Sequence, residues 1–267
     1  MSIITKREIE SLYRQYHNPQ YLGLDPLGCV RRFEDSENRE VVGLFASALA
    51  YGRVETIVRN INTLIDDVMG RDPVSFVKGT SYREKREALD GFKHRFNDGD
   101  DIAALLEAVN AVTRRYGSLG SCFSDCLARS GGQFKGALTL FTDELKGVLT
   151  QGSATRCALR PSFEYLIPSP TRGSACKRLV LYLRWMVRKD DGIDLGVWKG
   201  VPASILIIPV DTHVARITKY YGLTSRTSAD WKMAEEITES LRKFDPEDPV
   251  RFDFSLCHAG MVDFRAR

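Results

Sequence analysis

The chain has 267 residues, of which 43% are hydrophobic and 27% charged, and this ordinary globular composition excludes a disordered protein. No apolar run approaches the ~20 residues that a membrane-spanning helix needs, and the N-terminal segment lacks the apolar core and cleavage site of a signal peptide. The net charge of +3 is too small to indicate a nucleic-acid partner by itself, and we expect a cytoplasmic protein without a membrane partner.

Hydrophobic periodicity predicts helices along almost the whole chain, so the expected fold class is all-α. Thr5-Lys6-Arg7-Glu8 has the form of a capping box and opens an amphipathic helix that runs to about Tyr16. Apolar residues at spacings of three and four predict helices over about 37–50 and 54–69. Further helices are expected over 101–115, 118–128, 134–149, 174–188, 212–220, 228–243 and 249–262, with Asp101 and Thr227 or Ser228 as candidate caps.

Two segments depart from this helical pattern. Residues 204–210 resemble a strand, but prolines at 202 and 209 bracket them, so we expect a single buried crossing segment rather than a member of a sheet. Residues 190–203 are rich in glycine and aspartate and form the clearest break in the chain. If this break is a hinge between two helical bodies, a site is expected in the cleft between them.

The six cysteines are scattered, and we expect them to be reduced and mostly buried. They are Cys29, Cys122, Cys126, Cys157, Cys176 and Cys257. Cys122 and Cys126 are one helical turn apart, but no second pair of cysteines or histidines lies nearby to complete a tetrahedral site. We therefore expect neither a metal nor a cofactor.

Basic residues concentrate in one part of the sequence. Residues 151–220 contain eleven lysines and arginines against five acidic residues, so this stretch carries +6 and the remainder −3. Such a distribution is typical of a one-sided surface for a polyanion, although a solvated face gives the same pattern.

Two segments of this basic region carry residues suited to chemistry. Residues 168–178 (PSPTRGSACKR) form a turn with proline and glycine that leads into a basic helix start, where free backbone N–H groups could bind phosphate. An ordinary connection capped by Ser174 is the alternative. In residues 209–217 (PVDTHVARI), Asp211 follows an apolar run and is expected at the N-cap of a new helix.

Together these segments resemble the helix-hairpin-helix DNA glycosylase superfamily, which contains endonuclease III and the 8-oxoguanine glycosylases. The family's hairpin, approximately L-P-G-V-G-x-K-[TV]-A, places its first glycine on Gly173 and its nucleophilic lysine on Lys177. Its V-D-T-H-[VI]-x-R stretch matches residues 210–216 and places its essential aspartate on Asp211. The helix containing REVVGLFASALAYGR resembles the family's early helix.

This resemblance implies two helical domains with a cleft between them. One would span 37–200, with the hairpin near 168–177, and the other 1–36 plus 201–267, carrying Asp211. The implied function is a DNA glycosylase with AP lyase activity that removes an oxidised base, 8-oxoguanine first, from double-stranded DNA without an obligate protein partner. The implied DNA-binding residues are Arg172, Gly173, Ser174, Arg178, His213 and Arg53, with Trp198 in the base pocket; for His213 a cap is the alternative role.

The chain also departs from the family pattern. Ala175 stands for the second hairpin glycine, and Thr171-Arg172 for the leading Leu-Pro. The separation of 34 residues between Lys177 and Asp211 resembles that in the archaeal 8-oxoguanine glycosylases. The chain as a whole is most similar to a bacterial branch of the superfamily that is nearest to this archaeal type. No cysteine quartet follows the last helix, so we expect no iron–sulfur cluster. In the family, a glutamine of the early helix often inserts into the DNA. Its position falls near Gly52 in this chain, and Tyr51 or Arg53 could replace it.

The chemistry explains the two residue types. A carboxylate stabilises the oxocarbenium-like sugar that forms as an N-glycosidic bond breaks. A lysine amine can attack C1′, expel the base and remain as a Schiff base through which the 3′ phosphate is eliminated. Lys189 and Lys199 are rival nucleophiles on the same stretch. A monofunctional glycosylase, or a non-catalytic nucleic-acid-binding protein of the same fold, stays open as an alternative.

Overall fold

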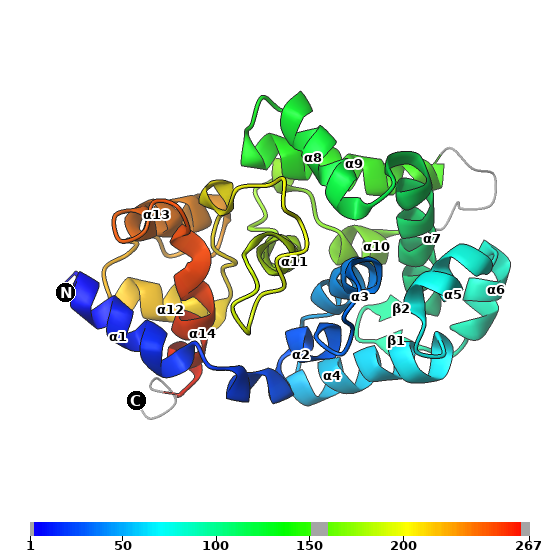
Figure 1. Ribbon diagram of the computed structural model, residues 1–267, viewed down its shortest axis with the longest axis horizontal. Coiled ribbons are helices and arrows are strands. Elements are labelled where there is room, and N and C mark those ends of the chain that lie inside the picture. Colours follow the sequence, from blue (N-terminus) through cyan, green and yellow to red (C-terminus); the bar gives the residue numbers. More distant parts are fainter. Residues whose placement is uncertain (1–2, 151–159, 263–267) are drawn as a thin grey trace. The chain divides into compact units, whose positions relative to one another are not determined.

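The computed structural model describes residues 3–150 and 160–262, together with the side chains of these residues except Leu24 and Arg172. The fold is all-α (Figure 1). Within the described residues the strands are β1 (Lys93–His94) and β2 (Asn97–Asp98), which pair antiparallel in one short hairpin. No helix of this part is long and apolar enough to cross a membrane.

The chain forms two compact units, and the N-terminal segment belongs with the C-terminal part. Unit 1 contains residues 1–22 and 170–267, and unit 2 contains residues 23–169. The sequence-based boundaries lay instead at 36/37 and 200/201. Residues 190–203 lie wholly inside unit 1, where Leu195 N donates to Trp185 O (2.9 Å) and Trp198 N to Met186 O (2.8 Å). These bonds hold the segment against its own helix, so the expected hinge at this position is wrong.

Unit 2 is built around one long helix, α7 (Gly99–Tyr116). The other elements of unit 2 are α2 (Pro26–Val30), α3 (Ser36–Ala48), α4 (Val54–Asn62), the π-helical η2 (Thr63–Val68), α5 (Pro73–Gly79), α6 (Tyr82–Ala88), α8 (Leu119–Arg129), α9 (Phe134–Thr150) and α10 (Pro161–Leu166). Helices α3, α5, α6, α8, α9 and α10 all contact α7, whose buried residues include Ile102, Leu105 and Leu106. The apolar stripe of α7 therefore forms the centre of this core.

Two close contacts fix helix ends in unit 2. The buried carboxylate of Glu40 on α3 accepts hydrogen bonds from Leu119 N (3.2 Å) and Gly120 N (2.9 Å) at the start of α8. At the start of α7, a Cβ added to Gly99 would lie 2.1 Å from the carbonyl oxygen of Leu89. The sequence pattern gave Asp101 as the cap of α7; the cap is Asp98, whose carboxylate accepts from Asp101 N (3.2 Å), and Asp101 closes the box.

Unit 1 joins both ends of the chain. Its elements are α1 (Lys6–Tyr16), η4 (Pro170–Arg172), α11 (Lys177–Val187), η5 (Ala203–Ile205), α12 (Thr212–Tyr220), α13 (Trp231–Arg242), η6 (Pro249–Phe252) and α14 (Asp253–Val262), while η1 (Pro19–Leu24) crosses the boundary to unit 2. Helices α1 and α12 both pack against α14. The capping box of Thr5 and Glu8 is confirmed, and Ile4 N donates to Tyr221 O at 3.0 Å.

The long helices expected from periodicity are confirmed, and one cap and the strand-like segment need comment. Helix α13 begins at Trp231 with Asp230 as its cap, whose carboxylate accepts from Met233 N (2.8 Å), so the expected caps Thr227 and Ser228 are wrong. Residues 206–210 are buried and do not belong to a sheet. This confirms the expected lone crossing segment.

Candidate active site

The segment before α11 contains two residues in the left-handed region. Gly173 has φ +76° and Cys176 has φ +47°; Cys176 is the N-cap of α11 but makes no side-chain capping bond. A left-handed non-glycine residue costs about 1 kcal/mol or more and persists where its surroundings fix it. Here Ser174 Oγ accepts from Cys176 N (3.2 Å), and Gly173 O accepts from Trp231 N (3.3 Å). The turn is therefore fixed to the start of α13.

Lys177 is the first residue of α11 and directly follows this turn. Its side chain is half-buried and forms no hydrogen bond or ion pair with any residue of the described part. The rival nucleophiles Lys189 and Lys199 are exposed. Lys177 also precedes Arg184 by seven residues, or about two helical turns, so both side chains leave the same face of α11.

Asp211 stands at the N-cap of α12, as the sequence pattern predicts. Its Oδ1 accepts hydrogen bonds from His213 N (2.9 Å) and Val214 N (2.8 Å). Its Oδ2 lies 3.7 Å from the thiol sulfur of Cys257 on α14. One carboxylate oxygen is thus committed to the cap and fixes the group, while the contact made by the other oxygen is a weak thiol one.

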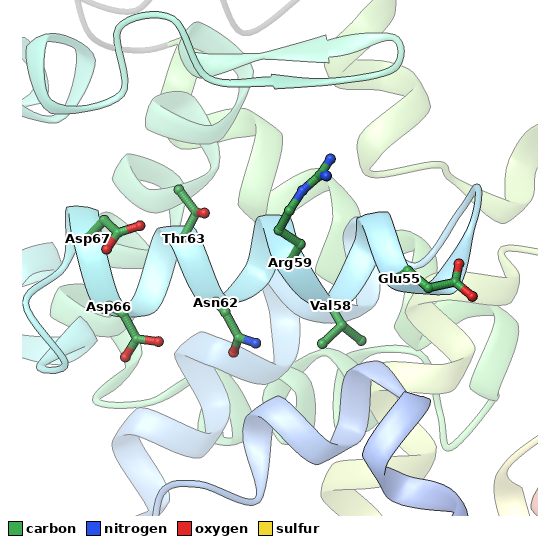
Figure 2. Close-up of a pocket in the computed structure, with 7 residues that line it drawn as sticks. All are labelled: Glu55, Val58, Arg59, Asn62, Thr63, Asp66 and Asp67. Carbon is green, nitrogen blue, oxygen red and sulfur yellow. The ribbon is translucent and has the colours of Figure 1, made fainter.

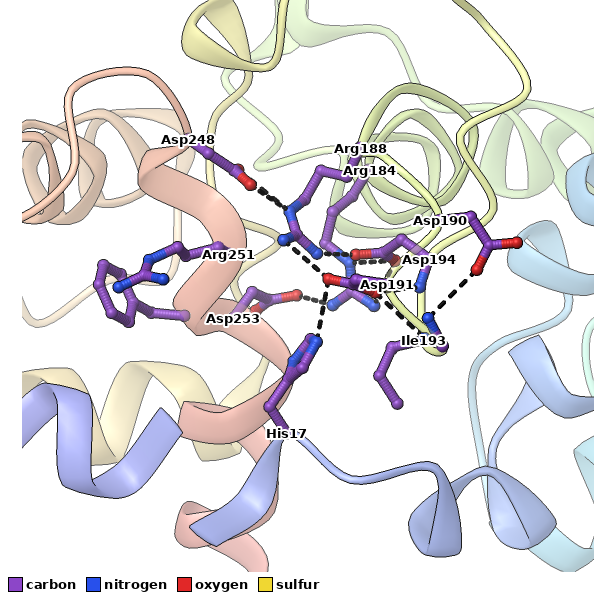
Figure 3. A network of polar contacts seen from close by, with 12 residues as sticks. His17, Arg184, Arg188, Asp190, Asp191, Ile193, Asp194, Asp248, Arg251 and Asp253 are labelled. Carbon is purple, nitrogen blue, oxygen red and sulfur yellow. Dashed lines mark hydrogen bonds and ion pairs between the residues drawn. The ribbon is translucent and has the colours of Figure 1, made fainter. Parts of the chain in front are cut away.

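A buried polar network lies between α11 and α14 in the same unit (Figure 3). It consists of His17, Arg184, Arg188, Asp191, Asp194, Asp248 and Asp253. Arg184 binds Asp194 at 3.0 Å and also binds Asp253, and both side chains of this second pair are nearly inaccessible to solvent. Two guanidinium groups therefore face four carboxylates, an excess of negative charge that burial makes costly.

Asp253 connects this network to Asp211. It is 3% exposed, and its Oδ1 has no hydrogen-bond partner in the described part of the chain. Burial raises the pKa of Asp253 to about 6; the Arg184 guanidinium opposes this rise, and the negative charge of Asp211 adds to it. The charge of Asp211 thus acts on Asp253, which binds Arg184 on α11, two turns along the helix from Lys177.

The other residues expected at the site are not all brought to a surface. Arg178 is 8% exposed and Trp198 is 5% exposed, with Trp198 packed edge-on against Tyr182 at 5.4 Å between ring centroids. This burial corrects both expectations, because a side chain in the core can neither bind phosphate nor form an open pocket wall. Gly173 and Ser174 are exposed.

Three further expected residues lie at different places. His213 is half-buried, and its backbone N–H is capped by Asp211. Arg53 belongs to unit 2, where it is exposed at the N-cap of α4. The side chain of Arg172, like residues 151–159 with Cys157, lies outside the described part of the structure.

Two arginines of the basic stretch 151–220 lie in the core, and two of the carboxylates that they bind, Asp191 and Asp194, belong to the same stretch, so these ion pairs leave its net charge unchanged. Arg184 and Arg188 are 3% and 1% exposed and bind carboxylates of the network. Two arginines four residues apart in the otherwise apolar LVLYLRWMVR helix are the sequence signal for such buried pairs, and the sequence interpretation missed it. Asp253 and Cys257 on α14 were also missed, since nothing in their local pattern marks them.

A separate groove of about 500 Å³ lies on α4 and η2 (Figure 2). It is lined by Glu55, Val58, Arg59, Asn62, Thr63, Asp66 and Asp67. Three carboxylates against one guanidinium make this groove unsuitable for a polyanion. It contains none of the residues expected at the site. No cluster of three or more histidine, cysteine or acidic side chains suited to a metal ion occurs in the described residues.

Comparison with known proteins identifies the family of the chain. A family model described as "protein of unknown function (DUF2400)" matches residues 25–262. No curated protein and no solved structure matches the chain.

Proposed function

The chain belongs to the DUF2400 family, and we propose that it is a DNA glycosylase with AP lyase activity, in which Lys177 is the nucleophile and Asp211 the catalytic carboxylate. The observation that carries the proposal is that one compact unit contains both a half-buried amine, which has no ion-pair partner among the described residues, and a carboxylate held rigidly by its own helix. The resemblance of the two segments to helix-hairpin-helix glycosylases supplies the reaction.

Each residue has a definite task in this reaction. The Lys177 amine, once unprotonated, attacks C1′ of the damaged nucleotide; the bond to the base breaks, and the base leaves with its electron pair. Asp211 stabilises the positive charge that develops on the sugar and accepts a proton from the amine. The C1′–O4′ bond of the sugar then breaks, O4′ takes the proton held by Asp211, and the departed base takes a proton from water. The resulting Schiff base allows loss of a C2′ proton and elimination of the 3′ phosphate. The target nucleotide must leave the stack for the amine to reach it.

Borohydride trapping on a duplex with one abasic site tests the nucleophile. Wild type should form a covalent adduct; Lys177→Ala and Lys177→Arg should form none, because a guanidinium keeps the charge but cannot form a Schiff base. Lys189→Ala and Lys199→Ala are matched controls and should trap as wild type does. If both Lys177 variants still form the adduct, another residue is the nucleophile. If wild type binds the duplex but forms no adduct, the protein is a monofunctional glycosylase or a non-catalytic binding protein.

DNA affinity should also fall with rising salt concentration, because phosphate binding releases counterions. Arg184 and Arg188 should not contribute to this slope, since both are buried in ion pairs. Affinity that is independent of salt contradicts the DNA-binding proposal as a whole.

For the lesion we propose an oxidised purine, with 8-oxoguanine first. Support comes from the 34-residue separation of Lys177 and Asp211, which resembles the archaeal 8-oxoguanine glycosylases. The buried Trp198 gives no further support. Single-turnover excision rates on duplexes with one lesion each test this choice: faster excision of thymine glycol or dihydrouracil than of 8-oxoguanine would refute it and leave the glycosylase proposal intact.

A further inference from the structure

Unit 2 exposes a cluster of aromatic rings that its core does not use. Phe96, in the turn of the β1–β2 hairpin, is 61% exposed, and Tyr165 on α10 is 43% exposed. Their ring centroids are 5.4 Å apart with the rings nearly perpendicular. Tyr51 completes the cluster, 5.2 Å from Tyr165 and 6.4 Å from Phe96, whose ring is parallel to it. Three segments distant in the sequence thus form one aromatic surface.

Hydrogen bonds hold this surface rigidly. The Tyr51 hydroxyl lies 2.9 Å from the carbonyl oxygen of His94 and 2.6 Å from Oδ1 of Asn97. Asn97 Nδ2 donates to Asp101 Oδ2 (2.9 Å) and to Ser162 O (2.8 Å), and Ser162 Oγ donates to Asp101 Oδ1 (2.9 Å). Asn97 is fully buried. A rigid support of this kind lowers the entropic cost of binding, because the rings are already in place.

Both signs of charge occur around the cluster: Asp98 lies opposite Lys93 in the hairpin and binds Arg160, while the nearest guanidinium to the rings has no carboxylate partner among the described residues. The Arg95 guanidinium lies 5.5 Å from the centroid of the Phe96 ring. Arg95 has φ +54°, the positive value that the first central residue of a two-residue hairpin turn adopts. Arg53 and Lys93 are exposed on the adjoining segments, and neither they nor Arg95 form an ion pair within the described chain. Glu55 is the nearest acidic residue in sequence to Arg53.

Exposed aromatic faces beside unpaired cations match one chemical class. Every nucleobase presents a planar π-face that stacks on an aromatic ring, while the neighbouring phosphates need positive charge. An apolar protein partner would use the rings but not the cations. We propose that Phe96, Tyr165 and Arg95 form a stacking site for an unpaired nucleobase and its phosphate. This inference rests on the proposed function for its choice of DNA as the ligand, and it names a contact outside Lys177 and Asp211.

The test uses the full chain and two duplexes of the same sequence, one fully paired and one with a single unpaired 2-aminopurine. Wild type should prefer the duplex with the unpaired base, and 2-aminopurine fluorescence should be quenched on binding. Phe96→Ala should weaken binding to that duplex about 5- to 150-fold, the range for loss of one stacked base, and leave binding to the paired duplex nearly unchanged. Phe96→Trp should restore both affinity and quenching.

Tyr220→Ala removes an aromatic side chain of similar exposure (47%) from unit 1 and is the matched control, expected to bind as wild type does. Because Phe96 is mostly exposed, its loss should not unfold the chain, and circular dichroism checks this. Unchanged affinity of Phe96→Ala, or no preference of wild type for the unpaired base, overturns the stacking site. Borohydride trapping in parallel separates the two proposals. Trapping without a Phe96 effect leaves the proposed function standing, and a Phe96 effect without trapping leaves the stacking site.

Discussion

Asp211 has two roles that substitution can separate, because its structural role needs an acceptor and its proposed chemical role needs a charge. In Asp211→Asn the amide oxygen can still accept from the N–H groups of His213 and Val214, and asparagine is as good an N-cap as aspartate. The interaction of a full charge with the helix dipole is lost, a cost of at most about 2 kcal/mol in the free energy of unfolding, and the repulsion between Asp211 and Asp253 is lost with it, which offsets part of this cost. Asp211→Ala also loses both hydrogen bonds and should cost about 1–2 kcal/mol.

The rate should respond differently. Both Asp211 variants should lose the stabilisation of the charged sugar, which we expect to lower the single-turnover excision rate about 10²- to 10³-fold, in the range found for single electrostatic groups in active sites. DNA affinity should stay close to that of wild type, because this carboxylate acts on the transition state.

The assay compares urea unfolding, DNA binding and single-turnover excision for wild type and both variants. Asp35→Asn is the matched control, since Asp35 caps α3 by accepting from Asn38 N (2.8 Å) and has no proposed part in the chemistry. If Asp211→Asn excises as fast as wild type, Asp211 is only a cap and the catalytic assignment fails.

The remaining predictions concern the two cores. Burial raises the folded-state pKa of Asp253 to about 6 from its usual 3.8, so wild type should lose stability as pH rises from 3.8 to 6. Asparagine does not ionise, so Asp253→Asn should gain about 3 kcal/mol in the free energy of unfolding relative to wild type between pH 3.5 and 7, measured by urea unfolding. A flat difference would refute the raised pKa. Gly99→Ala should destabilise unit 2 by about 1–3 kcal/mol or more because its Cβ would meet the Leu89 carbonyl, whereas Gly79→Ala, with open space around it, should not, and equal thermal shifts would contradict this. Glu40→Ala should cost about 1–3 kcal/mol by leaving the buried N–H groups at the start of α8 without their carboxylate, and an unchanged unfolding midpoint would contradict that reading.

The sequence predicts the long helices well because each repeats its apolar stripe over three turns or more. Helices α2, α5, α6 and α10 have five to seven residues, too few for a periodic pattern, and they were not predicted. Asp25-Pro26 and Asp72-Pro73, an N-cap followed by proline at the first helical position, are the signals that would have found two of them.

The candidate site also has a part that local sequence predicts and a part that it does not. Asp211 as an N-cap follows from residues that are neighbours in sequence, and it is confirmed. The burial of Arg178 and Trp198 and the coupling of Asp253 to Asp211 depend on packing between helices far apart in the chain. Local pattern carries no information on such contacts.

The closing of unit 1 by both ends of the chain has a consequence for synthesis on the ribosome. Unit 2 is continuous, so all of residues 23–169 can emerge and fold before residues 170–267 are made. Helix α1 is made before unit 2 but has to wait, because Glu10 binds Arg251 and Ile4 pairs with Tyr221 only after those later residues have been made. Until then α1 exposes Ile9 and Tyr16, which are buried in the finished protein, and nascent chains stalled before residue 220 should bind a chaperone through this helix.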